Sequence, residues 1–256
     1  MQLGVKRVTP EAIEKWKVER GYDLPYFWNQ KAEGSGVISK TIFFQKSIRM
    51  FVGDFGRAED GRDIWREIST RMGPSLAIAL PTFILGLFVT IACALTLAFF
   101  RATPLDFWGV VLCVGMMSIS TLFYIIGGQF LVSKSLRLVP ISGFGEALDA
   151  WRFLVLPVVI GVISGMGAST RWYRTIFLEE VGKDYVRTAR AKGLSERVVL
   201  YKHALRNALL PVVTVLGLQF GNVLAGAILV ETVFNWPGLG RLAFDSVLRR
   251  DYPTIL

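Results

Sequence analysis

Four long runs of uncharged, mostly apolar residues set the pattern of this chain. Each run is about as long as the ~20 residues that a helix needs to cross the core of a bilayer. The charged residues that bound the runs are Arg71 and Arg101, Asp106 and Lys134, Arg152 and Arg171, and Arg206 and Glu231. The pattern therefore predicts an all-α membrane protein with spans over about residues 76–100, 107–133, 153–176 and 208–230.

Prolines and glycines within the runs indicate helices that pack against one another. Membrane helices tolerate proline where neighbouring helices satisfy the freed backbone groups. Glycines four residues apart let helix backbones approach closely. These residues are Pro81, Pro157 and Pro211, and the pairs Gly161 with Gly165 and Gly217 with Gly221.

Uncharged polar side chains also occur inside the runs. Gln219 and Asn222 share one face of the fourth predicted span, and the second span carries Ser118, Ser120, Thr121 and Gln129. Such residues either line a polar pathway or form hydrogen bonds between helices. No charged residue lies deep in any run, which argues against a transporter driven by protons or ions.

The first 75 residues have a different pattern, with mixed charge and no run long enough for a signal peptide or a span. We expect residues 1–75 to form an extracytoplasmic amphipathic region and residues 76–256 to form the membrane domain. Thr9 and Pro10 predict a helix start, and Gly21 predicts its end. Residues 40–52 either lie along the membrane surface or belong to a small helical subdomain, and residues 32–37 predict a flexible joint.

Composition and charge agree with this class. The chain has 256 residues, 52% of them hydrophobic, and a formal net charge of +9. The densest basic stretch, residues 184–206, lies between two predicted spans, so its charge indicates a cytoplasmic loop and not nucleic-acid binding. In this loop Gly193 suits a left-handed helix end, and Ser195 suits the cap of a second helix.

The loop also orients the other segments. Residues 1–75, 135–150 and 232–256 are then external, which places both ends of the chain outside. A long external segment without a preceding signal or span is unusual. We therefore expect a further helix before Met1 and another after Leu256.

The sequence motifs do not indicate an enzyme. Gly182 and Lys183 are followed by Asp184, so no Walker A loop is present for ATP hydrolysis. The chain has a single histidine, His203, which leaves no set of residues for catalysis, a cofactor or a metal ion. Cys93 and Cys113 lie in apolar runs, where structural thiols are expected.

Two stretches resemble a known family. YVRTARAKGLSERVVLYKHALRNALLP (185–211) and LVETVFNWPGLGRLAFDSVLRRDYP (229–253) are similar to the permease subunits of bacterial ABC importers of the dipeptide, oligopeptide and nickel class. Residues 8–30 and 51–81 look like the external loop and second helix of the longer permease type in that family. The fold implied is the type I transmembrane domain of an ABC importer, here without its first and last helices.

The resemblance implies that the basic loop is a coupling helix, the EAA loop, which docks into a groove on an ATP-binding subunit. The residues that match are Tyr185, Arg187, Thr188, Ala189, Arg190, Ala191, Lys192, Gly193 and Leu194. The general pattern begins Glu-Ala-Ala, whereas this chain has Arg187, Thr188 and Ala189. That departure favours the peptide class. Small residues, here Ala189 and Ala191, suit close approach to a partner, and the charges suit orientation.

A second signal is VFNWPGLG (233–240), which by resemblance is an external turn near an outer gate. Pro237 and Gly238 suit the centre of a type II turn, and Phe234 and Trp236 suit the membrane interface. A plain membrane-anchoring turn is compatible with the same residues.

The function implied is import of peptides or a similar small solute across the bacterial inner membrane. The partners implied are a second permease, ATPase subunits and an extracytoplasmic solute-binding protein. A passive channel or a structural membrane subunit is the alternative, and binding of an ATPase by residues 187–194 separates the two.

Overall fold

The computed structural model describes residues 10–19, 22–29, 36–48, 53–58, 60–145, 149–225 and 227–255. The chain divides into two compact units, residues 1–67 and residues 68–255 with Leu256 assigned to the first. The described residues contain no strand, and their only bridge joins Arg57 to Asp63.

The first unit contains three short helical segments: α1 (Pro10–Glu19), α2 (Gly36–Ser39) and the π-helix η1 (Phe43–Ile48). Pro10 is the first described residue and lies in α1, whereas Thr9 and Gly21, the residues on either side of the predicted helix, lie outside the described residues. Gly36, predicted in a joint, instead begins α2, while residues 32–35 and 49–52 lie outside the described residues. Asn29 joins the segments because its side-chain amide donates to the carbonyl of Lys40 at 3.0 Å.

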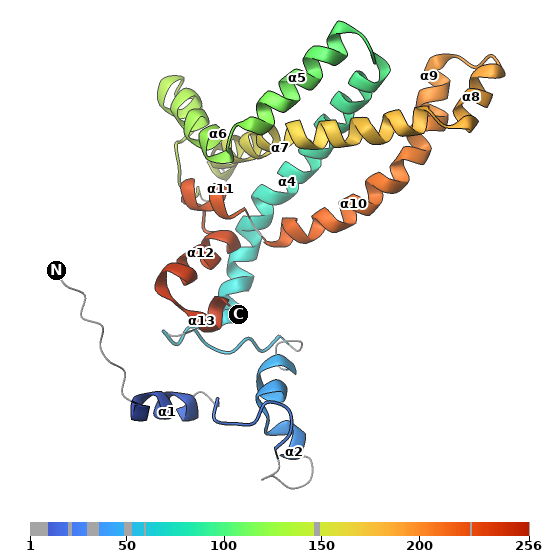
Figure 1. Ribbon diagram of the computed structural model, residues 1–256. Helices are drawn as coiled ribbons and strands as arrows, with labels where there is room; N and C mark the ends of the chain where they lie inside the picture. The colour runs from blue at the N-terminus through green and yellow to red at the C-terminus, as the bar shows by residue number, and fades with distance from the viewer. Residues whose placement is uncertain are drawn as a thin grey trace. The chain divides into compact units, whose positions relative to one another are not determined.

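Helices of very different lengths form the second unit (Figure 1). They are α4 (Ile64–Phe99), α5 (Pro104–Ser118), α6 (Thr121–Gly128), η2 (Gln129–Ser135), α7 (Ala150–Val181), α8 (Asp184–Ala191), α9 (Glu196–Val198), η4 (Val199–Ala204), α10 (Leu205–Ala225), α11 (Ile228–Val233), α12 (Leu239–Arg249) and α13 (Tyr252–Ile255). Among the described residues, three helices are long and apolar enough to cross a membrane, and a bent pair provides a fourth candidate. Figure 1 shows α8 and α9 at one end of α10 and α11 at its other end.

The second predicted span, 107–133, is not one continuous helix. α5 and α6 meet at a bend of 90°, with Ile119 and Ser120 in extended conformation. The hydroxyl of Tyr124 donates to the carbonyl of Met116 at 2.9 Å, a carbonyl that also accepts from the N–H of Ile119 at 3.4 Å. The bond from Tyr124 therefore joins α6 to α5 across the break, while the hydroxyl of Ser118 donates back to Val114 at 2.9 Å within α5.

The fourth predicted span, 208–230, also differs. Its helix starts at Glu196 in the basic loop and ends at Ala225, after which α11 begins a separate short helix. The predicted second helix of the loop is therefore continuous with the helix of the span.

Close packing joins the spans. A Cβ atom on Gly161 of α7 would lie 2.7 Å from a methyl carbon of Thr82 on α4, so this glycine allows the two helices to approach as predicted. Gly165, Gly217 and Gly221 face open space within this chain. An ion pair also holds α7 to α5, because Arg174 donates twice to the buried carboxylate of Asp106, at 2.8 and 2.7 Å.

Candidate functional sites

The basic loop is built around one left-handed residue. α8 ends at Ala191, and Gly193 has φ +78°, a conformation that side chains with a Cβ rarely adopt. The chain then turns back, and α9 begins at Glu196 with Ser195 extended at the N-cap. The predicted helix end at Gly193 is confirmed. Ser195 occupies the predicted cap position but makes no side-chain capping bond.

The inner face of α8 is held by a small apolar cluster. Its buried members are Val181, Val186, Ala189, Val199 and Ala204. Val186 is fully buried and Ala189 is 5% exposed, so both side chains point toward the start of the following helix. Ala189 therefore packs within the chain, and Ala191 is the small residue that remains exposed.

Glu180 anchors the first turn of α8. Its carboxylate accepts hydrogen bonds from the ammonium of Lys183 at 2.5 Å and from the hydroxyl of Tyr185 at 2.8 Å. The hydrogen bond to Glu180 raises the pKa of the Lys183 ammonium. Tyr185, predicted as a docking residue, is thus half-buried and fixes where the loop leaves α7.

A second ion pair spans the turn at Gly193. Arg190 of α8 donates to both oxygens of Glu196 in α9, at 3.1 and 2.6 Å. The hydrogen bond from Arg190 lowers the pKa of the Glu196 carboxyl and in turn raises the pKa of the guanidinium. Sequence analysis did not single out Glu196, although its place one residue after Ser195 is typical of acidic residues at a helix start.

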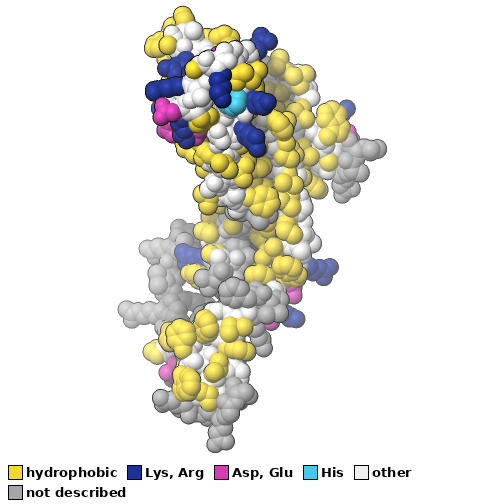
Figure 2. Space-filling view, turned by 90° about the vertical axis from the view of Figure 1, so that its right-hand side faces the viewer, with side chains coloured by type: hydrophobic (Ala, Val, Ile, Leu, Met, Phe, Trp, Pro, Cys, Tyr) yellow, Lys and Arg dark blue, Asp and Glu magenta, His cyan; other side chains and the backbone are white. Residues whose placement is uncertain are grey.

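The outward face of the loop is positively charged. Its exposed members are Arg187, Thr188, Arg190, Ala191, Lys192, Gly193, Leu194, Arg197 and Lys202. Figure 2 shows Lys and Arg side chains in dark blue gathered around the histidine in cyan at this end. Leu194 and Tyr201 are 40% and 60% exposed, so apolar surface lies among the charges. The outward face of the loop thus combines positive charge with exposed apolar side chains.

At the other end of α10, the aromatic turn (residues 233–240) differs from the predicted type II turn. Such a turn needs positive φ at its second central residue, but Gly238 has φ −100° and begins α12 as its N-cap. The left-handed residue is Asn235, with φ +57°. Gly238 is needed for space, because a Cβ there would overlap the carboxylate of Glu231.

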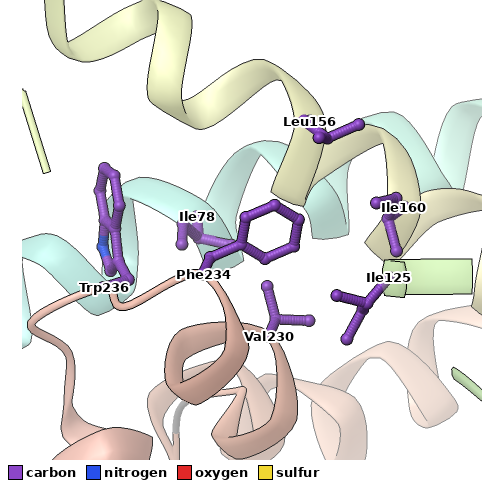
Figure 3. Close-up of a cluster of buried hydrophobic side chains, with 7 residues drawn as sticks. All are labelled: Ile78, Ile125, Leu156, Ile160, Val230, Phe234 and Trp236. Carbon is purple, nitrogen blue, oxygen red and sulfur yellow. The ribbon is translucent and has the colours of Figure 1, made fainter. Parts of the chain in front are cut away.

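The aromatic residues of this turn are buried, and the predicted place at the membrane interface is corrected. Phe234 is 2% exposed and Trp236 is 1% exposed. Both belong to a cluster with Ile78, Ile125, Leu156, Ile160 and Val230, and Figure 3 shows the ring of Phe234 in its middle. The indole N–H of Trp236 donates to the carbonyl of Pro74 at 2.8 Å. The turn is thus fastened to α4 through the protein interior.

Glu231 completes this attachment and was not predicted as a site residue. Its carboxylate is 1% exposed and accepts from the hydroxyl of Ser75 at 2.6 Å, from the N–H of Arg241 at 3.0 Å and from the N–H of Ala227 at 3.3 Å. Ser75 also accepts from the N–H of Leu239 at 2.7 Å. We call Glu231 and Ser75 the buried clasp, because they join α4, α11 and α12.

Two adjoining cavities lie between α4, α7 and α10. Their volumes are about 140 and 330 Å³, and both are lined by Thr82, Phe83, Gly161 and Gln219. The residues that line them are uncharged, and the smaller one adds Thr90, Ser169 and Tyr173. Gln219, predicted for a polar pathway, therefore faces open space. The side chain of Asn222 lies outside the described residues.

The helices define a multi-pass membrane protein with a basic loop at one end of α10 and a clasped turn at the other. Residues 62–256 match the family described as binding-protein-dependent transport system inner membrane component, and the chain belongs to this family.

Two relatives support the assignment. The chain is 38% identical over 214 residues to the glutathione transport system permease protein GsiC of Salmonella typhimurium (strain LT2), which covers 83% of this chain and 69% of the relative. It is 34% identical over 284 residues to the dipeptide transport system permease protein DppB of Escherichia coli (strain K12), with 100% of this chain and 80% of the relative covered. The chain is accordingly a permease component and not an enzyme. The alternative of an uncoupled channel or structural subunit is not favoured.

Proposed function

We propose that this chain is the transmembrane permease subunit of an ATP-driven ABC importer that moves peptides, or a similar small solute, across the bacterial inner membrane. The names of the relatives support this substrate class, since one transports glutathione and the other dipeptides. The cavities lined by hydroxyl groups and by Gln219 suit a solute rich in amide groups.

The proposal rests mainly on α8, which has one face buried against the chain and one face exposed. Val186 and Ala189 hold one face against the next helix, and Arg187, Thr188, Ala191 and Lys192 remain exposed on the other. In the proposal this exposed face, with Arg190, Gly193 and Leu194, docks onto an ATPase subunit. Tyr185 and Ala189 support it from behind. A second permease and an extracytoplasmic binding protein complete the importer.

The proposed orientation places residues 184–206 in the cytoplasm and residues 135–150 outside. Gln219 and Asn222 then belong to the pathway, and Phe234, Trp236, Pro237 and Gly238 belong to an external gate. Labelling of single cysteines in intact cells tests this, after replacement of Cys93 and Cys113. An impermeant reagent should react from outside with Ser142→Cys and not with Ser195→Cys, and the reverse result contradicts the orientation.

The docking proposal is tested at Gly193. Gly193→Val should leave membrane insertion intact and abolish both solute uptake and co-purification with the ATPase, because a β-branched residue at φ +78° is strained by about 1–2 kcal/mol or more. Each ~1.4 kcal/mol lost at a docking surface weakens binding about tenfold.

Two control variants separate the turn from general damage. Gly193→Asn should retain most uptake, because asparagine tolerates left-handed conformation. Gly115→Val, on the exposed side of α5 with open space around it, should also retain uptake. Retention of wild-type uptake and ATPase binding by Gly193→Val would show that the loop is not the docking site.

A further inference from the structure

The outward face of α12 is apolar. Phe244, Val247 and Leu248 are 39%, 58% and 67% exposed, and their spacing places them on one side of the helix. The opposite side packs inward through Leu242 and Ser246, which are 6% and 3% exposed. A helix at a water-exposed surface has a polar outward face, so the apolar outward face of α12 requires an apolar neighbour.

Positive charge stands at the end of the same helix. Arg249 and Arg250 are both exposed, and neither forms an ion pair with another described residue. The acidic residue that follows, Asp251, is 5% exposed and accepts a hydrogen bond from the hydroxyl of Thr254 at 2.8 Å. The two arginines therefore present uncompensated charge beside the apolar face.

Apolar side chains beside a pair of arginines are suited to the interface between the acyl chains and the headgroups of a bilayer. Acyl chains cover the apolar face at shallow depth, and arginine side chains reach back to the headgroup phosphates. Tyr252, which is 59% exposed, adds an aromatic ring of the kind that favours the membrane interface. A protein partner would satisfy the apolar face, but the arginines would then need acidic groups at its rim.

We propose that α12 is an interfacial helix whose apolar face lies among lipid acyl chains just below the headgroups, while Arg249 and Arg250 bind phosphates of anionic lipids. The inference depends on the membrane location of the chain and not on what it transports. It gives the aromatic turn a second support besides the buried clasp, because α12 follows that turn directly.

Fluorescence quenching tests where the apolar face lies. The full chain carries a bimane label at Leu248→Cys, after replacement of Cys93 and Cys113, and is reconstituted in vesicles of phosphatidylcholine and phosphatidylglycerol in equal parts. Lipids brominated near the top of the acyl chain should quench this label, and aqueous iodide should not. A label at Lys192→Cys in the basic loop is the matched control and should show the opposite pattern.

Lipid selectivity tests the arginines. Brominated phosphatidylglycerol should quench the Leu248 label more than brominated phosphatidylcholine at the same mole fraction, since each arginine near an anionic surface contributes up to about a fivefold preference. Arg249→Gln with Arg250→Gln should bring the two quenching values together. Arg187→Gln with Lys192→Gln, which removes equal charge elsewhere, should leave the difference unchanged. Inorganic phosphate should not displace the brominated lipid.

Three results overturn the proposal. Quenching of the Leu248 label by iodide shows a water-exposed face. Protection from both quenchers shows a face covered by protein, and equal quenching by the two lipids in the parent shows that the arginines bind no anionic headgroup. These experiments do not measure solute uptake or ATPase binding. A result against the interfacial helix therefore does not contradict the proposed transport function.

Discussion

The basic loop and the aromatic turn are both short reversals at the ends of α10, but their structures are maintained in different ways. The ion pairs of the basic loop join residues close in sequence, Glu180 with Lys183 and Arg190 with Glu196. The aromatic turn bonds to residues on α4 that are 156 to 164 positions away. Contacts between residues close in sequence hold the basic loop, whereas contacts between distant parts of the chain hold the aromatic turn.

The environments of these polar groups differ as well. Arg190 and Glu196 are 39% and 50% exposed at their side chains, so water screens their attraction. Glu231 is fully buried and depends on its donors for every favourable contact. Equivalent substitutions should therefore affect the two regions very unequally.

The largest effect is expected for Glu231→Ala. The change leaves the hydroxyl of Ser75 and the N–H groups of Ala227 and Arg241 without this acceptor, and each buried unsatisfied group costs about 1–3 kcal/mol. We expect a loss of about 3 kcal/mol or more, measured as a lower melting temperature in detergent and faster proteolysis near the turn. Glu179→Ala, at an exposed position on α7, is the control. Equal melting temperatures for Glu231→Ala and Glu179→Ala would show that the buried clasp does not stabilise the protein.

Gly240→Ala should have the next largest effect. A Cβ at this position would lie 2.7 Å from the backbone nitrogen of Ile228, so α11 and α12 must move apart. Overpacking of this kind typically costs about 1–3 kcal/mol. Gly221→Ala has open space and should be neutral or slightly stabilising, since alanine favours helix. A neutral Gly240→Ala in the same melting experiment would show that the two helices separate easily.

Trp236→Phe removes one hydrogen bond and keeps most of the buried ring. Loss of the indole N–H that donates to Pro74 should cost about 1 kcal/mol. Trp172→Phe, a change of the same kind at a side chain that is 42% exposed, should melt like the parent. A clearly larger loss at Trp236 would mean that ring packing, and not the hydrogen bond, dominates.

The smallest effect is expected in the basic loop, for Glu196→Gln. An exposed ion pair contributes between about 0 and 1 kcal/mol. Because Arg190 lowers the pKa of Glu196, the contribution is present above the ordinary pKa of the carboxyl and is lost as pH falls through the lowered value. The difference in melting between parent and variant should thus vanish in acid. A loss comparable to that of Glu231→Ala at neutral pH would remove the contrast between the regions.

The sequence predicted what depends on local chemistry or on long patterns. The uncharged runs predicted where the spans lie, and Gly193 by itself predicted the left-handed turn at the end of α8. The bend at Ile119 and Ser120 carried no proline or glycine and was missed. The side-chain bond across it, from the hydroxyl of Tyr124 to the carbonyl of Met116, joins α6 to α5, and only the folded chain brings these groups together.

The predicted conformation of the aromatic turn was wrong for a related reason. Pro237 and Gly238 match a common turn type, but the space taken by the Glu231 carboxylate decides the conformation. Tryptophan near a span end is typical of an interface, whereas Trp236 finds its acceptor on α4. Glu231 marked the end of an uncharged run and was therefore taken as a boundary, although it is a buried centre of hydrogen bonds.

The helix from Glu196 to Gly221 connects the basic loop to Gln219 at the cavities. At about 1.5 Å per residue, Gln219 lies roughly 35 Å along this helix from Glu196. A tilt of about 10° imposed at the loop would displace the far end by roughly 6 Å, close to the rise of one helical turn. A small angular change at one end is thereby converted into a displacement as wide as a side chain at the other.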